Sequence, residues 1–98
     1  MFKIKPRAKD IELVQTCGAC PEQYDAIYNG KIVGYLRLRH GSFRVDVPDC
    51  GGETVYTASP KGDGAFYGDE RDKYLHKAKK AIAKHIRNDS DGYRTNEQ

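Results

Sequence analysis

The chain has 98 residues, of which 32% are charged and 38% hydrophobic, and its formal net charge is +3. This length favours one domain with a thin core, and the charge is well below that of proteins that coat nucleic acid over their whole surface. No apolar run approaches the roughly 20 residues of a membrane-spanning helix. Three cysteines argue against a secreted disulfide framework, and the N-terminus lacks a signal-peptide pattern, so we expect a cytoplasmic protein.

The N-terminal residues alternate between basic and other side chains, and Pro6 interrupts any long strand pairing. We therefore expect residues 1–9 to form a basic arm or a short edge strand. A domain over residues 10–88 follows, and its β-forming residues 11–16 predict a first strand. The segment CGACPEQ, residues 17–23, contains glycine and proline and predicts a loop.

Three turn signals then divide the chain into short β-rich runs. Asn29-Gly30 is the preferred pair for a two-residue type I′ hairpin turn, and His40-Gly41 and the segment PDCGG mark two further turns. These turns predict an antiparallel meander of the strands 24–28, 31–39, 42–48 and 53–58.

A glycine-rich loop over residues 59–68 leads into a predicted helix over 69–88. Apolar residues recur there at helical spacing and predict a buried stripe of Leu75, Ala78, Ile82 and Ile86. We expect residues 89–98 to be a disordered polar tail. The predicted fold class is α+β, an antiparallel meander of four to five strands with one C-terminal α-helix packed on one face.

The turns also assign side chains to the two faces of the sheet, because side chains alternate along a strand. The Asn29-Gly30 turn pairs Tyr24 with Tyr35, and the second turn pairs Arg37 with Arg44. The apolar face, which we expect under the helix, carries Ile27, Ile32, Leu36, Leu38, Phe43, Val45, Val47 and Tyr56. The other face carries Tyr24, Val33, Tyr35, Arg37, Arg39, Arg44, Asp46 and Val55.

Like charges on one rung, such as Arg37 and Arg44, destabilise a sheet by up to about 1 kcal/mol. One interpretation is a solvated face on which Asp46 dilutes the charge, and another is a contact with a protein partner or a second copy. A third is an anion-binding face, because arginine binds phosphate bidentately and tyrosine stacks on bases. The predicted ligand-binding residues are Arg37, Arg39, Arg44, Tyr24 and Tyr35.

The predicted helix has a second basic feature, in which cationic residues recur every three or four positions. This secondary basic stripe consists of Lys73, Lys77, Lys80, Lys84 and Arg87. It is either the solvated face of the helix or a surface that contacts phosphates or an acidic partner.

The cysteines raise the question of a zinc site. Cys17 and Cys20 have the spacing of a zinc knuckle, and Cys50 with His40 supplies two further potential ligands. In the predicted meander, however, Cys50 lies at the opposite end of the sheet from the Cys17 loop, roughly 25 Å away. We therefore expect no metal and no cofactor, and only Cys17, Cys20 and His40 remain as ligands that share one end.

Catalysis is not indicated by any motif. The histidines fall in a turn and on the helix without an evident nucleophile beside them, and GDGAFYGD has neither Walker nor EF-hand spacing. We expect a protein that is not an enzyme.

Several phrases, CGACPEQYD, GYLRLRHG, PDCGGETVY, GDGAF and ERDKYL, make the chain similar to small, poorly characterised proteins of bacteriophage and bacterial genomes. The resemblance covers roughly residues 17–86. It implies a cytoplasmic, phage-encoded accessory protein of a kind that counters host defence by binding a defence protein or sequestering a nucleotide signal. The order of strands and helix also resembles the arm-binding domains of phage integrases, whose sheet enters the major groove, although no catalytic domain follows here.

The leading hypothesis is non-catalytic binding of a phosphate-bearing, nucleotide-type ligand, with the arginines on phosphates and the tyrosines on a base or ribose. A homodimer is expected, because so small a domain needs a second copy to close the site. The alternatives are a nucleic-acid-binding module that uses the same face with the helix stripe, and an inhibitor that binds an acidic host protein.

Overall fold

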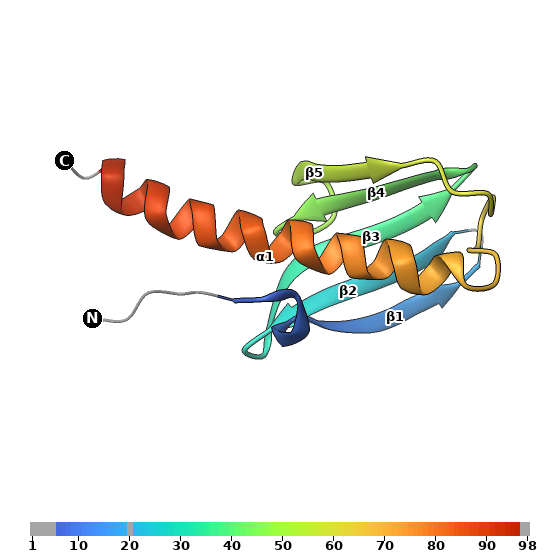
Figure 1. Ribbon diagram of the computed structural model, residues 1–98, viewed down its shortest axis with the longest axis horizontal. Helices are drawn as coiled ribbons and strands as arrows, with labels where there is room; N and C mark the ends of the chain where they lie inside the picture. Colours follow the sequence, from blue (N-terminus) through green and yellow to red (C-terminus); the bar gives the residue numbers. More distant parts are fainter. Residues whose placement is uncertain (1–5, 20, 97–98) are drawn as a thin grey trace.

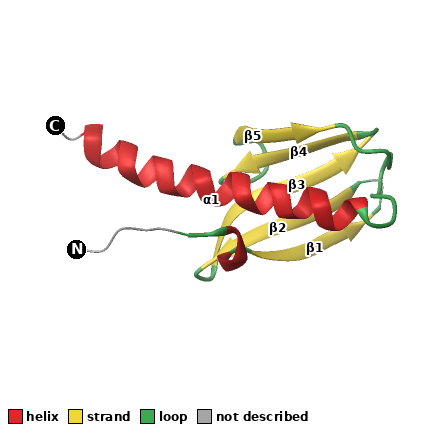
Figure 2. Ribbon diagram, in the orientation of Figure 1, coloured by secondary structure: helices red, strands yellow, loops and turns green. Residues whose placement is uncertain are grey.

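Five strands pair in the order in which they occur in the chain. The computed structural model describes residues 6–19 and 21–96, with side chains through Asn88. The strands β1 (Glu12–Gly18), β2 (Glu22–Tyr28), β3 (Lys31–Arg39), β4 (Ser42–Val47) and β5 (Glu53–Ala58) form one antiparallel sheet in the order β1-β2-β3-β4-β5 (Figure 1). The helix α1 (Glu70–Asn96) lies across one face of this sheet (Figure 2). The predicted α+β meander with one C-terminal helix is therefore confirmed.

The two tight hairpin turns have the backbone that their residues predict. Asn29 and Gly30 have φ of 53° and 78°, and His40 and Gly41 have φ of 54° and 73°. Two successive positive φ values are the mark of a type I′ turn, whose twist matches that of paired strands. The turns set the predicted pairs of Tyr28 with Lys31 and of Arg39 with Ser42.

The ends of the chain are more ordered than the sequence predicts. Residues 1–5 lie outside the described part, but the 3₁₀ turn η1 (Ala8–Asp10) packs on α1, and Arg87 Nη1 donates a hydrogen bond of 2.6 Å to the Pro6 carbonyl oxygen. Residues 6–9 are therefore neither a free arm nor an edge strand. The helix α1 continues to Asn96, past the predicted end at residue 88, since no proline interrupts the chain after residue 60.

A bulge between β2 and β3 overturns part of the predicted register. Ile27 pairs with Ile32 as predicted, but Ala26 pairs with Gly34, which leaves Val33 as an extra residue without a partner on β2. An extra residue reverses the side-chain alternation beyond it. Tyr24 consequently pairs with Leu36, not with Tyr35, and its side chain lies on the face that α1 covers.

The core lies between that face and the helix. It includes the predicted residues Leu36, Leu38, Phe43, Val45, Val47, Ala78 and Ile82, together with Tyr24, Ala26, Ile11, Phe66 and Ala83. Two predicted members are wrong, because Ile32 is 45% exposed and Ile27 does not pack against this cluster. Val33 and Val55, predicted on the opposite face, are extra residues at bulges and pack against the core. None of the described helices combines the length and apolar character needed to cross a bilayer.

Gly34 marks the closest approach of α1 to the sheet. A Cβ atom at this position would lie 2.7 Å from Ile82 Cδ1, and Ile82 is fully buried. We expect Gly34→Ala to lower the free energy of unfolding by about 1 kcal/mol, since overpacking forces neighbouring side chains off their rotamers. Urea denaturation of the variant measures this loss.

Two further variants test whether the contact with Ile82 is the cause. Ile82→Val removes the Cδ1 atom, so the double variant should lose less stability than the sum of the two single losses. Gly18→Ala is a matched control, because a Cβ there meets nothing within 4 Å. If the losses of unfolding free energy at Gly34 and Ile82 are strictly additive, contact with Ile82 is not the reason that this position requires glycine.

Candidate functional site

The face of the sheet opposite α1 carries a group of arginines at one end. We call Tyr35, Arg37, Arg39, Ser42 and Arg44 the arginine face. The register pairs Arg37 directly with Arg44 and Arg39 with Ser42, as predicted from the His40-Gly41 turn. Since α1 and η1 both lie on the other face (Figure 1), these side chains are not part of the main core.

The Arg37–Arg44 rung contains buried donors without acceptors. Among the described residues, the Nε atoms of both arginines are buried without a hydrogen-bond partner. Arg44 Nε lies 3.3 Å from Asp46 Oδ2, which is within ion-pair distance but lacks hydrogen-bond alignment. A buried donor without an acceptor is costly, and so are like charges on one rung. An anion held by the two guanidinium groups would offset the cost of the like charges.

A shallow hollow of about 340 Å³ lies over this rung and is lined by Arg37, Arg39, His40, Ser42 and Arg44. Among the described residues that line it, none is acidic, and all carry side-chain hydrogen-bond donors. His40 and Ser42 come from the hairpin turn and its flank, and sequence reasoning did not assign them to the site. The sequence could have indicated them, because the turn that pairs Arg37 with Arg44 also places residues 40 and 42 beside Arg39.

Asp46 lies on the same side of the sheet as Arg44 and contacts it. Its carboxylate is almost fully buried and accepts a hydrogen bond of 2.8 Å from Thr54 Oγ1 and one of 3.3 Å from the Gly51 amide. The same carboxylate faces Arg44. Asp46 therefore ties the β4–β5 turn to the sheet and orients one of the two opposed arginines.

Tyr35 lies on the arginine face, as predicted, but its hydroxyl is engaged. It donates a hydrogen bond of 2.6 Å to Gln23 Oε1. Burial raises the pKa of Tyr35, the neighbouring Cys50 adds to the rise, and Arg37 and Arg44 oppose it. Tyr35 is thus a half-buried, neutral hydrogen-bonding residue within the face.

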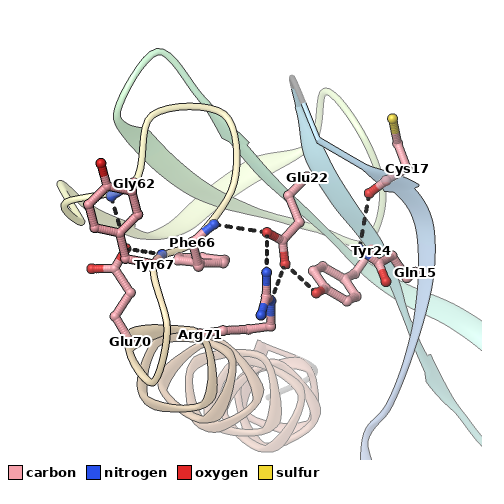
Figure 3. Close-up of polar contacts among 9 residues, drawn as sticks. All are labelled: Gln15, Cys17, Glu22, Tyr24, Gly62, Phe66, Tyr67, Glu70 and Arg71. Atoms are coloured by element: carbon pink, nitrogen blue, oxygen red, sulfur yellow. Dashed lines mark hydrogen bonds and ion pairs between the residues drawn. The ribbon is translucent and has the colours of Figure 1, made fainter.

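Tyr24 does not belong to the arginine face, and the prediction that it does is wrong. The bulge turns its side chain toward α1, where it is only 6% exposed. Its hydroxyl donates to Glu22 Oε2 (Figure 3), and burial together with this carboxylate raises the pKa of Tyr24 to about 12. Tyr24 therefore has a structural role on the opposite side of the sheet.

Glu22 is the centre of that structural cluster, and sequence reasoning missed it. Its fully buried carboxylate accepts hydrogen bonds of 2.8 and 3.2 Å from Arg71 and one of 2.9 Å from the Phe66 amide, besides that from Tyr24 (Figure 3). Burial by itself would raise the pKa of Glu22, but the hydrogen bonds from Arg71, Tyr24 and Phe66 hold it below its usual value. The cluster fastens β2 to the start of α1.

The loop over residues 59–68 is fastened by a second carboxylate. Glu70 accepts hydrogen bonds from the amides of Lys61, Gly62 and Tyr67 at 3.0, 2.9 and 2.7 Å. These amides lower the pKa of Glu70, with Tyr67 contributing most. The loop also reaches the hairpin beside the arginine face, where the Gly41 amide donates to the Asp63 carbonyl oxygen at 2.8 Å. The loop is therefore fixed to Glu22 through the Phe66 amide, to Glu70 and to the β3–β4 hairpin. We assign it no role as a lid.

The secondary basic stripe lies on the helix, on the other side of the molecule from the arginine face. Lys73, Lys77, Lys80 and Lys84 are exposed, and Arg87 is half-buried against Pro6. Because the sheet separates the two basic surfaces (Figure 1), they do not form one continuous face. A nucleic-acid module that uses both surfaces would have to contact its ligand on both sides of the sheet.

Cys17 and Cys50 lie at the opposite ends of the sheet where the meander predicts them. Cys17 pairs with Gln23 at the end of the sheet that also carries the His40-Gly41 turn, and Cys50 lies in the β4–β5 turn. Cys20 lies outside the described residues. In the part of the chain that the structure describes, no three His, Cys, Asp or Glu side chains gather where they could bind a metal ion.

Comparison of the chain with protein-family models, with curated proteins and with solved structures found no match.

Proposed function

We propose that the protein binds a phosphate-bearing ligand of the nucleotide type at the arginine face, without converting it. The observation that carries the proposal is the opposed pair of Arg37 and Arg44 beneath a hollow with no acidic lining among the described residues. Phosphate oxygens supply the negative charge and the hydrogen-bond acceptors that guanidinium groups bind.

The size of the hollow favours a small ligand. A volume of about 340 Å³ is near the lower end of the roughly 300–1,000 Å³ typical of small-molecule sites. The burial of Tyr24 removes one of the two proposed stacking surfaces, and the Tyr35 hydroxyl is bound to Gln23. Phosphates, more than the base, are therefore the proposed determinants of affinity, with Arg37, Arg39 and Arg44 as the principal contacts.

This proposal extends to a biological role. A protein that holds a nucleotide without consuming it lowers the free concentration of that nucleotide, so we propose sequestration of a nucleotide signal in the cytoplasm, as in phage counter-defence. The hollow is open to solvent, and we propose that a second copy of the chain closes it. The alternative of an acidic host protein is distinguished from this one by the experiment below.

Isothermal titration against cyclic mononucleotides, cyclic dinucleotides, ADP-ribose-type nucleotides and inorganic tripolyphosphate tests the proposal. At least one nucleotide should bind, and Arg37→Gln/Arg44→Gln should weaken its binding by about 100-fold, because each lost charge-assisted contact is worth roughly 1.5 kcal/mol. The variant should remain folded, because it removes a like-charge rung while Asp46 keeps its hydrogen bonds from Thr54 and Gly51.

Lys9→Gln/Lys31→Gln is the matched control, because it changes net charge equally at exposed residues outside the hollow. It should bind as the unsubstituted protein does. If no compound in the panel produces heat, the small-ligand proposal is wrong. Capture of an acidic host protein that depends on Arg37 and Arg44, in the absence of nucleotide binding, would instead establish the inhibitor alternative.

A further inference from the structure

A second basic site lies on the helix side of the molecule, in a groove between η1 and α1. The groove has a volume of about 550 Å³, and small apolar residues, Ala8, Ala81 and Ala83, contribute to its lining. The other lining residues are basic: Arg7, His76, Lys80, Lys84 and Arg87. Only three of these belong to the stripe predicted from the sequence, since Arg7 comes from the segment before η1 and His76 was not assigned.

The basic residues of the groove form a line. His76, Lys80 and Lys84 follow one another at i, i+4 spacing and therefore share one side of the helix. At 1.5 Å per residue, successive members are about 6 Å apart along the axis, and the row from residue 76 to Arg87 extends over about 16 Å. A compact anion needs convergent donors, whereas a row of this length fits an extended polyanion.

Among the residues whose side chains are described, few neutralise this row. Within the residues whose side chains are described, no ion pair involves Lys80, Lys84 or Arg87. Arg87 is fixed by the neutral carbonyl group of Pro6, which orients the guanidinium group and leaves its charge in place. Arg7 is the exception, since its Nε lies 3.9 Å from Asp10 Oδ2 across an exposed pair. Like charges at i, i+4 spacing destabilise a helix, so a bound polyanion relieves a strain that is present in the free protein.

We propose that this groove binds the phosphate backbone of single-stranded nucleic acid, independently of the ligand at the arginine face. Lysine and arginine in a row contact successive phosphates. Alanines offer no stacking surface, so binding is insensitive to base sequence. The groove lies between one helix and one short turn, and a single strand is the occupant that we propose for it.

Fluorescence anisotropy with a labelled oligothymidylate of twenty nucleotides, in a series of salt concentrations, tests the proposal. Four cations on phosphates predict a slope of log K against log salt of about −2.8, at about −0.7 per contact. Lys80→Gln/Lys84→Gln should reduce the magnitude of this slope by about 1.4 and weaken binding at low salt by at least tenfold.

The same helix supplies the matched control. Lys73→Gln/Lys77→Gln removes two exposed lysines with the same spacing that do not line the groove, and it should leave the slope nearly unchanged. Arg37→Gln/Arg44→Gln should also bind the oligonucleotide normally, so failure here is distinguishable from failure at the arginine face. Equal losses in both lysine variants, tighter binding of a duplex, or displacement of the oligonucleotide by equimolar poly-glutamate would each overturn the proposal.

Discussion

Glu22→Gln is expected to lower the free energy of unfolding by about 3 kcal/mol. The carboxylate is fully buried and accepts hydrogen bonds from Tyr24, Phe66 and Arg71. Glutamine has one acceptor oxygen, and its amide group meets donors where acceptors are needed. Breaking a buried ion pair from one side costs about 3–5 kcal/mol, and the lower value applies because the Arg71 side chain is 41% exposed and regains water. Urea denaturation at neutral pH measures the loss.

The pH dependence of the stability of the same variant shows whether the charged Glu22 carboxylate is the cause of the loss. The pKa of Glu22 in the folded protein is below its ordinary value of 4.5, so its contribution to stability is complete above about that pH. That contribution is lost as the pH falls through the lowered pKa. The stability difference between the unsubstituted protein and Glu22→Gln should therefore be constant from pH 7 to 5 and shrink below pH 4.5.

Glu12→Gln serves as the control, because Glu12 is an exposed carboxylate on the neighbouring strand β1. It should change stability by less than about 0.5 kcal/mol. Glu22→Gln/Arg71→Gln should lose less than the sum of its two single variants, since both remove the same contacts. A Glu22→Gln protein as stable as the unsubstituted one would show that the cluster of Figure 3 does not hold the fold.

Phe43→Ala is expected to be at least as damaging, with a loss of about 4 kcal/mol. Phe43 is fully buried at the centre of the aromatic part of the core. Its ring makes edge contacts with Phe66, Tyr56 and Tyr74, at centroid distances of 5.1, 6.1 and 6.3 Å. Alanine leaves a cavity bounded by rings from β5, the loop and α1, which cannot all move inward to fill it. The loss is measured by urea denaturation.

Tyr67→Ala is the aromatic control, because this ring is exposed beside the same loop. It should change stability by no more than about 0.5 kcal/mol. Phe66→Ala, combined with Phe43→Ala, should show a coupling of about 1 kcal/mol, as expected for an aromatic pair in contact. A loss at Phe43 no larger than that at Tyr67 would mean that the rings do not form a packed cluster.

Most of the fold could be predicted because its information is local. Asn29-Gly30 and His40-Gly41 are turns whose chemistry sets both their own backbone and the pairing next to them. Each strand of a meander pairs with its neighbour in sequence, so two known turns were enough to place β2, β3 and β4. The opposed Arg37 and Arg44 followed from the same register without any knowledge of the helix.

The errors arise where a tertiary contact decides the outcome. Ala26 and Gly34 are small and face Ile82, so the sheet accommodates α1 there and absorbs an extra residue at Val33. No feature of the β-rich runs in the sequence indicates that extra residue. It moved Tyr24 from the predicted ligand-binding face to the core and exposed Ile32.

The missed site residues show the same limit. Glu22 precedes Tyr24 by two positions and so shares its face, but only the docking of α1 supplies Arg71. Arg7 joins Lys80 and Lys84 because the segment before η1 folds back on the helix, a contact between opposite ends of the chain. His40, in contrast, could have been assigned from the hairpin alone.

The hydrophobic core of the described residues lies on one face of the sheet, and this has a consequence for how the protein can evolve. The core and the Glu22 cluster lie on the helix side, whereas the arginine face contributes little to the core. Substitutions at residues 37, 39 and 42 can therefore change the charge of this face with little effect on the core, whereas Arg44 also faces the buried Asp46. Substitutions that alter this surface and substitutions that alter the core fall largely on separate sets of residues.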